Sequence, residues 1–198
     1  NQLLLNRRGE LISFGFFNSK EAPHAIVTGK SGAGKSVFGN DVINQGLRTG
    51  GRVWILDRGG SYRHLNEMLG GDYISFDAAR PQRINPCGKA GLDGVCPDEK
   101  QSFLRDWLTE MATRGKSELP ARDQGLLTEA IRKAFQEHPG EEIRLGYVHA
   151  ALKSLAGTYP SALDLALSIA DFCGAGPYAR FFDGADEVDF KRPLVTLD

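Results

Sequence analysis

Short apolar runs alternate with polar, glycine-rich segments over the first half of the chain, and this pattern predicts β-strands. The first two runs flank a turn that contains Arg7, Arg8 and Gly9, so we expect them to form a hairpin. Residues 25–28, 52–56 and 73–76 are the next predicted strands, and we expect 52–56 to be buried. The predicted hairpin strands are residues 3–5 and 11–17, and the last predicted strand of the chain is 194–197.

Segments in which apolar residues recur at helical spacing lie between or after these strands. One such segment begins at Lys35 and stops at Gly50-Gly51, and a shorter one, which Ser61 is expected to cap, ends at Leu69. Between 97 and about 173 the spacing is helical almost throughout, with proline or glycine at the breaks. We expect four helices there, with apolar stripes along 103–111 and 126–135 and shorter segments at 148–155 and 163–172.

The order of these elements predicts an α/β fold with a parallel sheet and an all-helical insertion. The strand at 25–28, the helix after it and the strand at 52–56 form a crossover, which places the two strands parallel. We expect three parts: residues 1–96 carry the hairpin and half of a sheet-based core, 97–175 form a helical subdomain, and 176–198 return to the core sheet.

Composition limits the function classes. The chain has 198 residues, 41% of them hydrophobic and 25% charged, and no apolar run approaches the roughly 20 residues that a membrane helix needs. Residues 1–86 carry 11 basic and 7 acidic residues, a balance of +4, whereas 87–198 carry 13 and 18, a balance of −5. The mildly basic first half suits a phosphate ligand, whereas the acidic second half argues against a polybasic nucleic-acid surface of its own, so DNA contact stays open but is not indicated. Three cysteines without C-x-x-C spacing suggest reduced thiols, and because the chain begins with Asn1 we expect an excised fragment.

The strongest chemical signal follows the apolar run at 25–28. The segment GKSGAGKS matches G-x-x-x-x-G-K-[ST], the loop whose backbone N–H groups surround phosphate oxygens at the start of a helix. We expect Lys35 to reach the β and γ oxygens of a nucleoside triphosphate, and Ser36 to supply a hydroxyl ligand to Mg²⁺. The predicted phosphate-binding residues are Gly29, Lys30, Ser31, Gly32, Ala33, Gly34, Lys35 and Ser36.

Four further segments follow the loop in a fixed order: GRVWILDRGGSY at 51–62, LGGDYI at 69–74, RINP at 83–86 and GPYARFFDG at 176–184. Together with the loop they resemble the conjugation and type IV secretion ATPases of the TraC kind, and the resemblance extends over nearly the whole chain. It implies a RecA-like P-loop motor core, related to DNA-pumping ATPases. It also implies a bacterial protein that hydrolyses ATP as a homo-hexamer in the cytoplasm, peripheral to the inner membrane and in contact with other secretion subunits.

Two other functions stay open beside an ATPase that drives pilus assembly or substrate transfer. A nucleotide-responsive structural subunit would use the same loop, and so would a hexameric DNA-pumping ATPase. The chain also lacks a recognisable acidic pair, sensor and arginine finger. We therefore expect it to bind ATP and Mg²⁺ but to hydrolyse ATP poorly on its own.

Asp57 is the candidate catalytic carboxylate, because it ends a strand predicted to lie beside the phosphate-loop strand. It is expected to hold a Mg²⁺-bound water or to orient the attacking water, the alternative being that it only caps the following turn. Asp198 also ends a strand, but the resemblance favours a plain strand end there. Asn85 is expected to shape a turn before Pro86. Phe181, Phe182 and Gly184 are expected to act as an anchor and turn that return the chain from the helices to the sheet.

Overall fold

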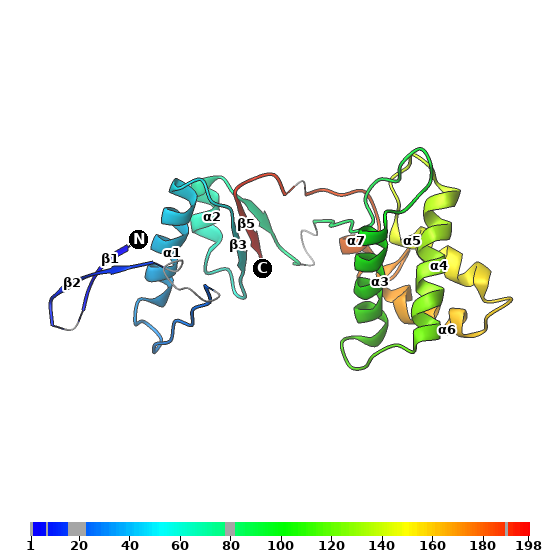
Figure 1. Cartoon of the computed structure of the whole chain (residues 1–198), viewed down its shortest axis with the longest axis horizontal. Coiled ribbons are helices and arrows are strands. Elements are labelled where there is room, and N and C mark those ends of the chain that lie inside the picture. The colour runs from blue at the N-terminus through cyan, green and yellow to red at the C-terminus, as the bar shows by residue number, and fades with distance from the viewer. Residues whose placement is uncertain (1, 7, 16–22, 78–81, 189) are drawn as a thin grey trace. The chain divides into compact units, whose positions relative to one another are not determined.

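The structure is a computed structural model that describes residues 2–6, 8–15, 23–77, 82–188 and 190–198. The chain divides into two compact units (Figure 1), one formed by Asn1–Tyr73 with Phe190–Asp198 and the other by Ile74–Asp189. The boundaries between these two units differ from those expected from the sequence, which lie at 96/97 and 175/176. The division expected from the sequence stays a prediction about domains. The phosphate loop, Asp57 and Asp198 all lie in the first unit.

The first unit begins with the expected hairpin. Strand β1 (Gln2–Leu5) pairs antiparallel with β2 (Leu11–Phe14). The Asn6 side-chain oxygen accepts hydrogen bonds from the N–H groups of Arg8 and Glu10, which fixes the tight turn. Arg7 of the predicted turn and positions 16 and 17 of the predicted second strand lie outside the described residues.

The remaining elements of this unit form a small α/β layer around a three-stranded sheet. Helix α1 (Lys35–Arg48) leads to β3 (Val53–Leu56), then α2 (Arg63–Leu69) and β4 (Asp72–Ile74), and β5 (Leu194–Leu197) completes the sheet in the order β3-β5-β4. β3 and β5 are parallel, with Leu56 opposite Leu197. A small core of α1, β3, α2 and β5 side chains holds the layer together: Ile43, Ile55, Leu65 and Leu194.

Three expectations about this sheet are wrong. The crossover that would place residues 25–28 parallel to β3, and so Asp57 beside the phosphate-loop strand, is not formed, because in the part of the chain that the structure describes the parallel neighbour of β3 is β5. Residues 25–28 are not a strand: a strand exists through hydrogen bonds to a neighbouring strand, and the sheets of the described residues contain β1 to β5 only. Ile26 is accordingly 91% exposed. Strand β3 is also not buried on both faces, because Ile55 points into the core whereas Trp54 and Leu56 alternate outward and are 54% and 84% exposed.

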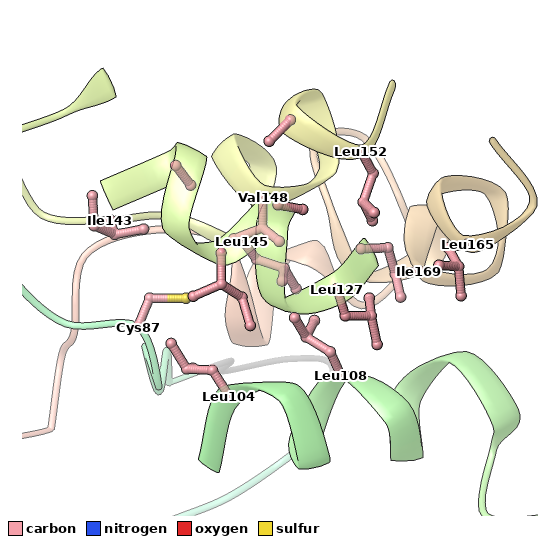
Figure 2. Close-up of a cluster of buried hydrophobic side chains, with 14 of the residues drawn as sticks. Cys87, Leu104, Leu108, Leu127, Ile143, Leu145, Val148, Leu152, Leu165 and Ile169 are labelled. Atoms are coloured by element: carbon pink, nitrogen blue, oxygen red, sulfur yellow. The ribbon is translucent and has the colours of Figure 1, made fainter. Parts of the chain in front are cut away.

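The second unit is built mainly from helices, as the apolar spacing predicts. Helices α3 (Asp98–Thr113), α4 (Ala121–Glu137), α5 (Leu145–Leu155) and α6 (Ser161–Ile169) pack on one another, and a 3₁₀ turn η2 (Ala170–Phe172) continues α6. Their inward leucine, isoleucine, valine and alanine side chains form one continuous core (Figure 2). A short helix α7 (Ala179–Phe182) follows where the sequence predicts an anchor.

The motif residues of the second unit are structural. Asn85 is buried, accepts a hydrogen bond from the Cys87 N–H at 3.0 Å and donates one to the Ile143 carbonyl at 2.9 Å, so it shapes the turn as expected. Phe182 packs edge-on against Trp107, as an anchor should. Asp183, which the sequence analysis did not single out, accepts hydrogen bonds from the N–H groups of Gly146 and Gly174. No helix of the described ranges is long and apolar enough to cross a membrane.

Candidate nucleotide-binding site

The phosphate loop owes its shape to its glycines. Gly32 and Gly34 have φ values of 77° and 86°, a region in which side-chain-bearing residues are strained, and the Ala33 N–H donates to the Lys30 carbonyl across the bend. A Cβ atom at Gly29 would lie 3.3 Å from the Ala33 Cβ, so the two sides of the loop approach too closely for a larger residue to fit without a shift. The backbone therefore forms a narrow cradle.

The Lys35 side chain lies across this cradle. Its ammonium group donates hydrogen bonds to the Gly29 carbonyl at 2.7 Å and to the Lys30 carbonyl at 3.0 Å. A lysine fixed by the loop's own backbone presents its remaining N–H donor and its positive charge at the loop. The ammonium group therefore lies at the loop, and its contact with phosphate oxygens stays a prediction.

Helix α1 begins directly from the loop with an open N-terminus. Gly34 occupies the N-cap position and has no side chain that could accept a hydrogen bond, and the first turn contains no acidic residue. The N–H groups of a first helical turn have no partners within the helix and carry the positive end of the helix dipole. A hollow of about 320 Å³ lies there, lined by Ser31, Gly32, Gly34, Lys35, Ser36 and Val37. This arrangement suits a phosphate group.

A second depression adjoins the same residues. It has a volume of about 580 Å³ and extends from Lys35 and Ser36 along α1 to β3 and to Tyr62. The Tyr62 ring lies against α1, where a Cβ atom at Gly39 would be 2.8 Å from the tyrosine oxygen. Gly39 thus leaves the space that lets Tyr62 reach the loop helix, a close approach between distant residues that no local sequence pattern indicates.

Asp57 lies at the carboxyl end of β3, and its side chain caps the turn that follows the strand. One of its carboxylate oxygens accepts a hydrogen bond from the Arg58 N–H at 2.8 Å, and the other accepts from the Tyr62 N–H at 3.0 Å. The expectation that Ser61 caps α2 is wrong: Tyr62 holds the N-cap position, no side chain caps the helix, and the N–H of Tyr62 itself binds the carboxylate of Asp57. The capping alternative for Asp57 is thus present in the structure, and its expected roles at Mg²⁺ and at water stay predictions.

Asp198 brings a second carboxylate to the same edge of the sheet. The Asp57 N–H donates to the Leu197 carbonyl at 2.9 Å, so Asp57 and Asp198 follow directly on neighbouring parallel strands. Asp198 accepts hydrogen bonds from the Gly59 N–H at 2.9 Å, the Gly60 N–H at 3.3 Å and the Tyr73 hydroxyl at 2.6 Å. A sequence that ends its strand with aspartate does not reveal these contacts, because the groups lie 125 to 139 positions apart.

Electrostatics in this cluster follow from those contacts. Burial and the hydrogen bond to Asp198 raise the pKa of Tyr73 to about 12. The same hydrogen bond, helped by the Gly59 N–H, holds the pKa of Asp198 below its usual value. Tyr73 therefore stays a protonated donor and Asp198 an ionised acceptor at neutral pH.

The glycine loop, the lysine fixed across it and the open helix N-terminus define a P-loop nucleotide-binding protein. Comparisons with known proteins agree. The TraG P-loop domain family matches residues 17–162, which is most of the chain. The chain belongs to this family.

The relatives extend the comparison. Protein TraC of Escherichia coli (strain K12) is 28% identical over 183 residues, which cover 87% of this chain and 20% of TraC. The structure of VirB4 of Thermoanaerobacter pseudethanolicus superimposes with a TM-score of 0.72 at 17% identity, over 99% of this chain and 56% of that one. The P-loop α/β fold class and the TraC resemblance predicted from the sequence are confirmed. The chain spans about a fifth of TraC and about half of the VirB4 chain.

Proposed function

We propose that this chain is the ATP-binding part of a type IV secretion or conjugative transfer ATPase, which couples ATP hydrolysis to pilus assembly or substrate transfer. The observation that carries the proposal is the Lys35 ammonium, held 2.7 and 3.0 Å from two loop carbonyls beside the open N-terminus of α1. Loop, charge and helix dipole converge on one point, as recognition of a triphosphate requires. Membership of the TraG P-loop family and similarity to TraC and VirB4 support the cellular role.

The residues at hand fit MgATP. The loop N–H groups and the first turn of α1 bind phosphate oxygens, Lys35 neutralises charge on the β and γ phosphates, and the Ser36 hydroxyl is a suitable oxygen ligand for Mg²⁺. Bound Mg²⁺ lowers the negative charge of the transferred phosphate group. In the proposed role, Asp57 accepts a hydrogen bond from a water molecule while its two backbone contacts keep the carboxylate oriented.

The same proposal covers assembly and rate. An arginine finger contributes about 10³ to 10⁵ in rate to NTPases of this kind, and we infer that it comes from elsewhere than these 198 residues. We propose a homo-hexamer that works in the cytoplasm against the bacterial inner membrane with other secretion subunits. On this view the chain alone binds ATP, hydrolyses it slowly and does not form a stable ring.

Replacing Lys35 tests the proposal. Lys35→Ala is expected to abolish ATP binding in calorimetry while the melting temperature without nucleotide stays close to that of the wild type, because an exposed lysine contributes little to stability. Wild-type chain should gain about 2.7 kcal/mol of stability at a hundredfold excess of MgATP over Kd, and the variant should gain none.

Arg48→Ala is the matched control, because it removes an exposed positive charge from the other end of α1. It should bind ATP like the wild type. Unchanged ATP affinity in folded Lys35→Ala would refute the assignment of the loop.

A further inference from the structure

We propose that Asp198 and Tyr73 are positioning residues, which hold the Gly59-Gly60 turn and thereby fix the Asp57 carboxylate at one end of the turn and Tyr62, which packs on the loop helix α1, at the other. The inference rests on the proposed function, since it concerns the carboxylate that we place near the attacking water. It adds two residues from β5 and β4 that do not belong to the P-loop motif. Neither residue is proposed to touch nucleotide.

The turn after β3 is held by carboxylates from two strands. Asp57 accepts from the N–H groups at both ends of the turn, those of Arg58 and Tyr62. Asp198 accepts from the two N–H groups in the middle, those of Gly59 and Gly60. Four backbone donors of one short turn therefore point at two carboxylates, and loss of either carboxylate leaves two of them without that acceptor.

The turn needs such support because of its composition. Gly59 and Gly60 have φ values of 103° and 70°, and two successive glycines lose more conformational entropy on ordering than any other pair of residues. A Cβ atom at Gly60 would lie 3.8 Å from both the Asp198 carboxylate and the Tyr73 hydroxyl. These two side chains, which we call the clamp, therefore lie directly against the backbone of the turn. The hydrogen bonds of the clamp offset the conformational entropy that the two glycines lose when the turn is ordered.

Tyr73 fixes the acceptor itself. Its hydroxyl donates to the second carboxylate oxygen of Asp198 at 2.6 Å, which sets the direction of the carboxylate toward the two glycines. The Arg63 guanidinium lies 5.0 Å from the centre of the Tyr73 ring and stabilises the ring in that position. Because the pKa of Tyr73 is raised to about 12, the hydroxyl keeps its proton over the whole working range of pH.

The turn connects this clamp to the loop helix. Its first residue is Asp57, and its last, Tyr62, packs on Gly39 of α1 and lines the same depression as Lys35 and Ser36. A displacement of the turn would therefore shift the Asp57 carboxylate and the Tyr62 ring together relative to the loop. Small displacements of a group that orients a reactant cost rate without changing substrate affinity to the same extent.

The experiment compares three variants with one control. Asp198→Ala removes the acceptor, Asp198→Asn keeps an oxygen for the Gly59 N–H, and Tyr73→Phe removes only the hydroxyl that orients it. Glu67→Gln, which removes a carboxylate from the exposed side of α2, is the matched control. Hydrogen exchange at the Gly59 and Gly60 amides is measured by NMR on the chain without nucleotide, and kcat and KM for ATP are measured in the full-length protein.

We expect Asp198→Ala to speed exchange at both glycine amides about tenfold, with smaller increases in Asp198→Asn and Tyr73→Phe and none in Glu67→Gln. In the same order kcat should fall, about tenfold for Asp198→Ala, while KM stays within about twofold. Partial rescue by asparagine separates loss of the acceptor from a general loss of folding. If Asp198→Ala does not fold, Tyr73→Phe alone decides.

Unchanged exchange at Gly59 and Gly60 would overturn the clamp. Faster exchange with an unchanged kcat would also overturn the proposal, because the clamp would then be purely structural. Failure of the proposed function gives a different result, namely ATP binding that persists in the Lys35→Ala variant. The exchange measurement is independent of that result, because it is made without nucleotide.

Discussion

Asp57 combines a structural contact with a proposed chemical role, and two substitutions separate them. Its carboxylate accepts backbone hydrogen bonds at 2.8 and 3.0 Å, and we take about 1 kcal/mol net for each in a partly exposed setting. Asp57→Ala loses both and should lower the free energy of unfolding by about 2 kcal/mol, within the range known for helix caps. Asp57→Asn keeps one oxygen acceptor and should cost about 1 kcal/mol.

Urea unfolding of the chain measures the structural part, and ATP turnover of the full-length protein measures the chemical part. If Asp57 orients water, Asp57→Asn should reduce kcat strongly while ATP affinity changes by a small factor, because the amide preserves shape and removes the charge. If turnover in Asp57→Asn equals that of the wild type, Asp57 is only a cap. A stability equal to wild type in Asp57→Ala would instead show that the two hydrogen bonds contribute nothing.

Three further expectations concern the helical unit. Burial raises the pKa of Cys87 and of Cys173 to about 12, so neither thiol should react with a thiolate-selective reagent at pH 8 until urea unfolds the chain; fast labelling of native protein would contradict this. Phe135→Ala should cost about 3 to 5 kcal/mol by circular dichroism melting, since this side chain is 1% exposed, whereas exposed Gln136→Ala should cost almost nothing. Burial lowers the pKa of His149 below 6.5, so the unfolded chain takes up this proton more readily and stability should fall as pH drops below 6.5; a His149→Gln variant should lose that part of the pH dependence in urea titrations.

The elements that depend on local spacing were predictable from the sequence. Helix α1 begins at Lys35 and the four helices of the second unit lie within the stretch whose apolar residues repeat at helical intervals. Helical hydrogen bonds join residues four apart, so the pattern that creates a helix is contained in one short window. The phosphate loop was equally local, because its motif GKSGAGKS is a run of eight consecutive residues.

Features that depend on distant groups were not predictable. Residues 25–28 have the composition of a strand, but no sequence window states whether another strand will pair with them. No side chain caps α2: its N-cap residue is Tyr62, whose own N–H binds the carboxylate of Asp57, five residues earlier, and the rule that assigned the cap to Ser61 does not capture this contact. Asp183 binds the N–H groups of Gly146 and Gly174 in the same way, through contacts that span 37 and 9 positions.

The register between β3 and β5 explains why the two carboxylates meet at one turn. Leu56 pairs with Leu197, so the next residue on each strand is an aspartate, and both side chains lie where the strands end. A shift of one residue along the strand would move Asp198 by about 3.3 Å and turn its side chain to the other face of the sheet, which would remove its hydrogen bonds to Gly59 and Gly60. The register is set by buried residues, since Ile55 and Leu194 must both point into the same small core. Packing of the sheet thus determines which backbone groups the second carboxylate can reach, and the motif at 57–62 acquires its shape from a strand that lies about 140 residues further along the chain.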